Sequence, residues 1–267
     1  MQKDKVVVGI DVGSSKVTTI IAAVQEDLKL NIIGVATSPS KGMRKGQVVD
    51  IDEAVSAITL SLEAAERMAG YSVGTAFVSV DGTHIESQNS KGVVAIGNPN
   101  GEISEDDVMR VVEAARAISL PSTKEILHVI PRNFIVDSQA GIKDPIGMNG
   151  VRLEVETHIV TGAATSLRNI AKCISQVGVD VEGMVFSGLA ASYSTLTDTE
   201  KELGVILVDF GGGTTDLSIF TEGAPAYSSV LPVGARNVTN DLAIGLRVSL
   251  ESAEKIKLAL SSPPTIA

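Results

Sequence analysis

The chain has 267 residues, of which 44% are hydrophobic and only 3% aromatic, so it can build a large core of aliphatic side chains. A formal net charge of −10 argues against nucleic acid as a partner and against direct adhesion to anionic lipid. Cys173 is the single cysteine, which excludes an internal disulfide, and no apolar run approaches the roughly 20 residues that span a bilayer.

The N-terminal segment predicts an α/β half-domain. Its strands, which are rich in branched aliphatic side chains, are expected at residues 6–11, 16–24, 30–37 and 73–80. The first two flank a turn at Gly13 and form a hairpin, and Asp52 is a candidate cap for a helix that ends near Ala69. The basic, glycine-rich segment 39–46 is typical of a solvated turn, but a contact with a phosphate or a partner fits it as well.

Residues 84–161 differ in character and predict a β-α-β-β unit. Ser104, with Asp107 three residues later, resembles a capping box and starts a helix that ends near Ile118. The β-prone segments, of which the first is a strand or a hairpin, are residues 87–96, 126–136 and 151–161. The three histidines lack the short spacing of a zinc site: His84, His128 and His158. We interpret this unit as an inserted interaction module.

The C-terminal part continues with a helix, a strand, a helix of small residues, a hairpin, a strand and two helices. Apart from the hairpin, these elements are predicted at residues 165–177, 179–186, 188–196, 226–233, 234–246 and 249–260. Cys173 lies on the apolar face of the first of these helices and is expected to fill core space. The small-residue helix suits a link between two half-domains, because small side chains let backbones approach closely.

The hairpin at residues 204–220 carries the first chemical signal. An aliphatic run ends at Asp209, and four turn residues follow it: Gly211, Gly212, Gly213 and Thr214. Glycines let backbone N–H groups approach an anion, while an acid beside them repels a bare phosphate. An acid and a phosphate-binding turn can share one site if a cation lies between the carboxylate and the phosphate. This combination indicates that the ligand is a metal–nucleotide. A simple turn between two strands is the alternative.

The N-terminal hairpin repeats this pattern. Aligning Asp11 with Asp209 also aligns Gly13 with Gly211, so each half of the chain offers an acid followed by a glycine turn. Hydroxyl and ammonium donors that suit terminal phosphates follow in the first copy: Ser14, Ser15 and Lys16. Two similar half-domains with one ligand between them would explain the repeat, although two unrelated hairpins would also give it.

Glu254 and Lys257 lie three residues apart, on one face of the last predicted helix. A surface ion pair is one interpretation. A carboxylate and an ammonium group that hold ribose hydroxyls is the other, and the spacing alone does not distinguish them.

Together these features resemble the superfamily of actin, sugar kinases and chaperone ATPases. Within it, five segments are similar to the bacterial cell-division protein FtsA: NIIGVATSPSKGM at 31–43, HVIPRNF at 128–134, GIKDPIGMNGVR at 141–152, GLAASYS at 188–194 and DFGGGTTD at 209–216. The resemblance implies an α/β fold of actin-like (ribonuclease H-like) half-domains with an inserted β-α-β-β subdomain 1C. Subdomain 1A would comprise residues 1–83 and 162–197, subdomain 1C residues 84–161, and an incomplete subdomain 2A residues 198–267.

The resemblance also implies a site for ATP and Mg²⁺. Asp11 and Asp209 would hold Mg²⁺ through water, as this cation prefers few carboxylates plus water and phosphate oxygens. The first phosphate loop would be Gly13, Ser14, Ser15 and Lys16, and the second Gly211, Gly212, Gly213 and Thr214. Glu254 and Lys257 match the superfamily's ribose-contacting pair. No catalytic residue is assigned, and weak or no ATP hydrolysis is expected rather than the activity of a metabolic enzyme.

Proteins of this family link FtsZ filaments to the cytoplasmic face of the inner membrane at the division septum, polymerise, and recruit later division proteins through subdomain 1C. They continue past the helix of Glu254 through subdomain 2B, a linker and a membrane-binding helix. The sequence is therefore expected to lack the FtsZ-tail site, the adenine wall and the membrane anchor. A kinase of a sugar or small metabolite, and a chaperone-type or pilus-assembly ATPase, are the alternatives within the fold.

Overall fold

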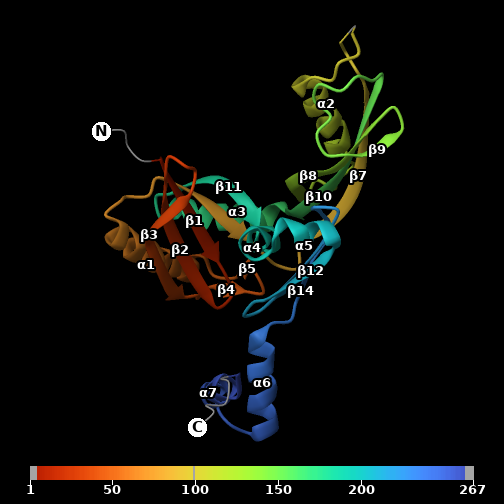
Figure 1. The fold of residues 1–267 in the computed structure, drawn as a ribbon. Helices are drawn as coiled ribbons and strands as arrows, with labels where there is room; N and C mark the ends of the chain where they lie inside the picture. The colour runs from red at the N-terminus through yellow and green to blue at the C-terminus, as the bar shows by residue number, and fades with distance from the viewer. Residues whose placement is uncertain (1–4, 99, 262–267) are drawn as a thin grey trace, which may run out of the picture.

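The computed structural model describes residues 5–98 and 100–261 (Figure 1). Its first sheet has five strands in the order β11-β6-β1-β2-β3, in which β1 is antiparallel to β2 and parallel to β6. The strands are β1 (Lys5–Val12), β2 (Lys16–Val24), β3 (Leu30–Pro39), β6 (Thr75–Val80) and β11 (Asp180–Phe186). This sheet contains the four strands that the N-terminal segment predicts.

Two helices, α1 (Ile51–Ala69) and α3 (Ala164–Gln176), share one aliphatic core with this sheet. Alternate residues of β1 and β2 point into it, as the period of two in a strand requires, and Cys173 is buried there as expected. Representative core side chains are Val8, Ile10, Val17, Ile21, Ile58, Leu62, Leu167 and Ile170.

The second sheet has the order β7-β10-β8-β9 and carries α2 (Glu105–Arg116) on one side; we call this unit the insert. Its strands are β7 (Glu86–Ala95), β8 (Lys124–Val136), β9 (Gln139–Ile142) and β10 (Arg152–Ala163). The insert has a core of its own, in which Val111 and Ala115 of α2 pack with Leu153 and Val155 of β10. It projects away from the first sheet (Figure 1).

The third sheet consists of β12 (Val205–Phe210), β13 (Thr215–Thr221) and β14 (Ala224–Leu231), and its first hairpin repeats the β1–β2 arrangement. Two short helices precede it, α4 (Ser187–Thr195) and α5 (Asp198–Leu203). The helices α6 (Ala235–Leu246) and α7 (Leu250–Ser261) follow it and pack on each other, drawn in blue in Figure 1. No helix among residues 5–98 and 100–261 is long and apolar enough to cross a membrane.

Several local predictions need correction. Asp50 rather than Asp52 caps α1, because its extended backbone lets the carboxylate accept a hydrogen bond from Glu53 N at 3.0 Å. The capping box of Ser104 and Asp107 is confirmed, but α2 ends at Arg116 rather than Ile118. The strand alternative is the correct one for segment 87–96, since β7 is a single strand that pairs with β10 along its length and ends at Ala95. Short elements were not predicted: α5, β9 and the two-stranded sheet of β4 (Met43–Arg44) and β5 (Gln47–Val48).

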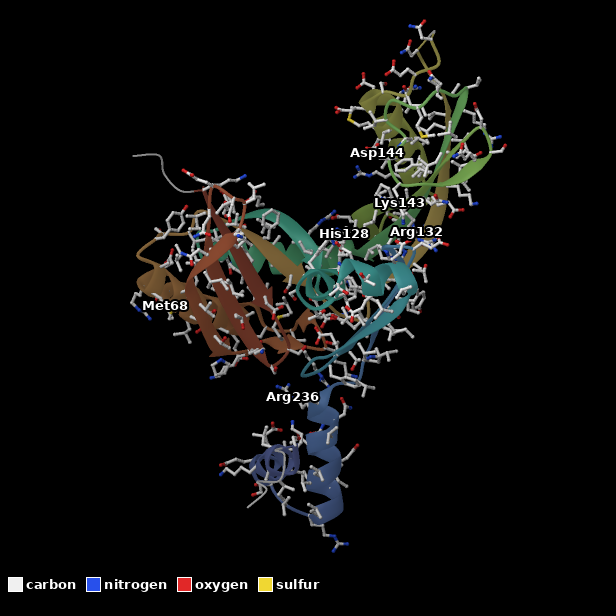
Figure 2. The ribbon with its side chains drawn as sticks, in the orientation of Figure 1. Met68, His128, Arg132, Lys143, Asp144 and Arg236 are labelled. Atoms are coloured by element: carbon white, nitrogen blue, oxygen red, sulfur yellow. The ribbon has the colours of Figure 1, made fainter. Side chains whose placement is uncertain are left out.

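The insert meets the third sheet through polar side chains, in the region where Figure 2 labels His128 and Arg132. His158 is fully buried, with Nδ1 2.8 Å from Asn89 Oδ1 and Nε2 3.0 Å from Ser228 Oγ. Ser87 Oγ donates to Ser228 O at 2.7 Å and accepts from Ser228 N at 2.9 Å. Burial lowers the pKa of His158 to about 4, so its ring is neutral near pH 7. We call this set of contacts the junction.

Gly92→Ala should destabilise the insert. A Cβ on Gly92 would lie 2.2 Å from the carbonyl oxygen of Val111, so α2 would have to move away from β7. We expect a loss of about 1–3 kcal/mol in the free energy of unfolding, measured with urea. Gly9→Ala is the matched control in strand β1, because a Cβ there meets nothing within 4 Å. Equal stability of the two variants would contradict the close approach of α2 to β7.

Candidate functional site

A cavity of about 730 Å³ opens between the first and the third sheet, and we call it the cleft. The turn after β1 (residues 13–16, the first turn) and the turn after β12 (residues 211–214, the second turn) both line it. Of the twelve residues that the sequence predicts for the site, every one but Gly213 lines the cleft. Gly213 lies beside it, where a Cβ would be 3.1 Å from Ser14 Oγ.

The two turns have the same backbone arrangement and touch each other. Gly13 N donates to Lys16 O at 3.1 Å, and Gly211 N donates to Thr214 O at 2.9 Å. A Cβ on Gly212 would lie 2.6 Å from the Cβ of Ser15, which is shorter than real contacts allow. Glycine is therefore required in the second turn, because the serines of the first turn occupy the space where its side chains would be.

Neighbouring segments hold the backbone of both turns. Gly46 N, in the turn between β4 and β5, donates to Ser14 Oγ at 2.8 Å. Ala235 N and Arg236 N, at the start of α6, donate to the carbonyl oxygens of Gly211 and Gly212, each at 3.0 Å. The basic segment 39–46, whose role the sequence leaves open, thus contacts the first turn through its backbone.

Four aspartates line the cleft, and two of them were not assigned from the sequence: Asp11, Asp81, Asp209 and Asp216. Burial raises the pKa of Asp11, whose Oδ1 accepts from Ser79 Oγ at 2.5 Å. Burial is also the main cause that raises the pKa of Asp216 to about 9, followed by its hydrogen bond to Asp81 and the nearby charges. Asp216 is therefore protonated at neutral pH, and its buried Oδ1 has no hydrogen-bond partner.

This set of groups fits a hydrated divalent cation. Crowded carboxyl groups with an unpartnered oxygen favour a positive charge between them, and oxygen ligands are those that Mg²⁺ prefers. Within residues 5–98 and 100–261, no three His, Cys, Asp or Glu side chains are placed to hold a metal ion directly. A cation that keeps its water ligands, and that Asp11 and Asp209 bind through these waters, agrees with the crowded carboxyl groups and with the lack of a direct ligand set among the described residues.

Glu254 and Lys257 of α7 also line the cleft and form an ion pair of 2.7 Å. The Lys257 side chain is only 18% exposed, so this is not an ordinary surface pair. Thr239 of α6 donates from Oγ1 to Glu254 Oε2 at 2.5 Å. The hydrogen bond from Lys257, and then that from Thr239, lowers the pKa of the Glu254 carboxyl.

Sequence reasoning missed several residues of the cleft. Asp81 follows β6, and Arg236 and Thr239 belong to α6, and none of the three lies in a glycine-rich pattern. Figure 2 shows Arg236 at the end of α6 that meets the third sheet, and its guanidinium lies 3.5 Å from the carbonyl oxygen of Ser14. Asp216 was visible as the second acid of the hairpin, but its burial and its pairing with Asp81 were not.

Asp216→Asn should stabilise the metal-free protein at neutral pH. The pKa of Asp216 rises from 3.8 to about 9 on folding, so the stability that its bound proton contributes is fully present below pH 3.8 and is lost as the pH rises toward 9. The asparagine side chain does not titrate, and its amide N–H can still donate a hydrogen bond to the carboxyl group of Asp81. Urea unfolding in EDTA should show a gain of about 1–3 kcal/mol at pH 8 and a flatter pH dependence. Parallel pH profiles of the two proteins would refute the raised pKa.

Two sequence models of one protein family match the chain. "SHS2 domain inserted in FTSA" matches residues 82–161, which include the insert except for the last two residues of β10, and "Cell division protein FtsA" matches residues 206–265. Together these matches cover more than half of the chain.

Curated relatives named "Cell division protein FtsA" align over nearly all of it. The protein of Pseudomonas aeruginosa is 43% identical over 258 residues, which are 97% of this chain and 61% of that protein. The protein of Bacillus subtilis is 43% identical over 260 residues, which are 97% of this chain and 59% of that protein. The chain thus spans about three fifths of the length of these relatives.

Solved structures confirm the fold. The PilM–PilN type IV pilus biogenesis complex contains a chain with a TM-score of 0.66 at 15% identity, over 94% of this chain and 68% of that one. The ethanolamine utilization protein EutJ of Carboxydothermus hydrogenoformans gives a TM-score of 0.55 at 15% identity, over 95% of this chain and 61% of that one. The predicted actin-like α/β fold with an inserted β-sheet unit is correct, and the chain belongs to the FtsA family of bacterial cell-division proteins.

Proposed function

We propose that the chain binds ATP with Mg²⁺ in the cleft between its first and third sheets. The observation that carries this proposal is the contact between two equivalent turns, each of which follows an acid and lines the same cavity. Glycine-rich turns of this kind suit the binding of phosphate groups. A related fold supports it, since MreB5 of Spiroplasma citri, with a TM-score of 0.50 at 12% identity over 95% of this chain and 62% of that one, is described as bound to AMPPNP.

In this proposal the phosphates lie between the two turns. Asp11 and Asp209 hold Mg²⁺ through its waters, and the cation neutralises the charge that the carboxyl groups would otherwise direct at the phosphates. Lys16 and Arg236 add positive charge at the phosphate end of the cleft. Glu254 and Lys257 mark the ribose end.

At the level of the cell, we propose the role of an adaptor in division. Membership of the FtsA family supports this role. The chain aligns with about three fifths of the length of its relatives. In this role, the protein polymerises and links FtsZ filaments to the cytoplasmic face of the inner membrane at the septum. The insert, as subdomain 1C (residues 84–161), recruits later division proteins, and its exposed apolar side chains, Met109, Ile146 and Val151, suit such contacts.

If the protein is an adaptor, it should not transfer phosphate from ATP to small molecules. We expect no phosphorylation of sugars or other small acceptors by the chain with Mg²⁺-ATP, and rapid turnover with any of them would favour a metabolic kinase instead.

We expect a full-length family member to retain FtsZ in a pull-down and this chain not to retain it. Retention by this chain would show that these 267 residues suffice to bind FtsZ.

Asp209→Ala should weaken Mg²⁺-ATP binding by at least about tenfold, because the metal loses one of its two anchoring acids. Isothermal titration calorimetry of the 267-residue chain measures the change. Removing Mg²⁺ with EDTA should cause a larger loss of affinity in the original chain than in the variant, since the variant has already lost part of the contact with the metal.

Asp144→Ala is the control, because Asp144 lies in the insert, away from the cleft (Figure 2). It should leave the affinity unchanged. Unchanged affinity in Asp209→Ala would contradict the assignment of that acid, and no heat of binding in the original chain would refute ATP binding by this chain.

A further inference from the structure

Asp81 stands at the end of β6, and its carboxyl group lies against the second turn. Thr214 Oγ1 donates a hydrogen bond to Asp81 Oδ2, and the protonated Asp216 is hydrogen-bonded to the same carboxyl group. Asp81 directly follows a strand of the first sheet, whereas Thr214 belongs to the second turn and Asp216 to β13 of the third sheet. These hydrogen bonds fasten the second turn to the first sheet, and we call them the latch.

The carboxyl group of Asp81 is held firmly on its own side of the latch. Strand β6 lies between β1 and β11, and Ser187 Oγ donates to its last carbonyl oxygen, Val80 O, at 3.2 Å. The next residue, Gly82, has a φ of 120°, which favours glycine, and its N–H bends back to donate to Asp81 Oδ1. Each oxygen of Asp81 therefore accepts a hydrogen bond within the protein, one from its own loop and one from the second turn.

The hydroxyl group of Thr214 has no hydrogen left for a ligand. A hydroxyl group has one O–H bond, and Thr214 directs it to Asp81. Thr214 is also buried, and its carbonyl oxygen accepts from Gly211 N at 2.9 Å, so backbone and side chain are both fixed within the turn. The second turn is thus left with backbone groups to offer to a phosphate, as a glycine-rich turn does.

We propose that Asp81 is a positioning residue of the phosphate site and that it acts through Thr214. Asp81 holds the second turn against the first sheet and takes the hydroxyl hydrogen of Thr214, so the second turn binds phosphate through its backbone alone. This inference rests on the proposed ATP binding. It also changes the role of Thr214, which the sequence places among the groups that contact the phosphates.

Two substitutions at position 81 separate the hydrogen bond from the charge. Asp81→Asn and Asp81→Ala both remove the carboxylate, but only asparagine keeps an acceptor for the hydroxyl of Thr214. In calorimetry with Mg²⁺-ATP, Asp81→Asn should bind about threefold to tenfold more tightly than Asp81→Ala. With Thr214→Val added to each, the two affinities should be equal, because the hydroxyl that needs the acceptor is gone. With Thr214→Ser added instead, the difference should return.

Two results of this comparison would overturn the proposal. Equal affinities of Asp81→Asn and Asp81→Ala with Thr214 in place would show that Asp81 does not position the turn. A difference that persists with Thr214→Val would show that position 81 acts by a route other than Thr214. A general loss of structure in Asp81→Ala would give this second result, because it does not depend on the hydroxyl.

Nuclear magnetic resonance of the Thr214 hydroxyl proton tests the latch without nucleotide. A buried hydroxyl that donates to a carboxyl group exchanges slowly with water, so it should give a signal that Asp81→Asn keeps and Asp81→Ala loses. Absence of the signal in the original chain, or its survival in Asp81→Ala, would overturn the latch.

The same signal separates the latch from the proposed function. Saturating Mg²⁺-ATP should leave it in place, because Thr214 stays bound to Asp81, and its loss would show that the hydroxyl turns to a phosphate. A chain that gives the signal but no heat of ATP binding would refute the proposed function, and with it the role of Asp81 in that function, while the latch itself would stand.

Discussion

The contact between the two glycine turns sets the geometry of everything around it. Ser15 occupies the space in which a side chain at position 212 would lie, so its side chain packs directly against the backbone of the second turn. The acids that precede the turns are thereby fixed across one cavity. Burial and the neighbouring carboxylates raise the pKa values of Asp11 and Asp216, and this arrangement of carboxyl groups suits a cation.

Much of the fold was predictable because its signals are local. Strand alternation, the capping box at Ser104 and the spacing between Asp11 and Gly13 are each contained in a few residues, and the structure reproduces them. The cap of α1 was placed two residues late, because Asp50 and Asp52 are chemically equivalent and only the backbone conformation before the helix distinguishes them. The short sheet of β4 and β5 escaped notice because two-residue strands carry no periodicity.

The missed residues of the cleft depend on tertiary contacts. Asp81 becomes part of the site because β6 lies beside β1, and Thr239 because α6 packs on α7. Neither residue differs in sequence from an ordinary strand end or helix position. The same is true of the pKa of Asp216, which follows from burial and from the approach of Asp81 rather than from its neighbours in the chain.

The junction gives the protein an internal spectroscopic reporter. The amide of Asn89 donates from Nδ2 to Ala226 O at 3.1 Å, which leaves Oδ1 facing His158 as an acceptor, so the proton of the neutral ring resides on Nδ1 and Nε2 accepts from Ser228. Free histidine in water mostly carries its proton on the other nitrogen. The ring nitrogen shifts of His158 therefore distinguish an insert attached to the third sheet from a detached one, in which the imidazole regains solvent and titrates near its ordinary pKa of 6.5.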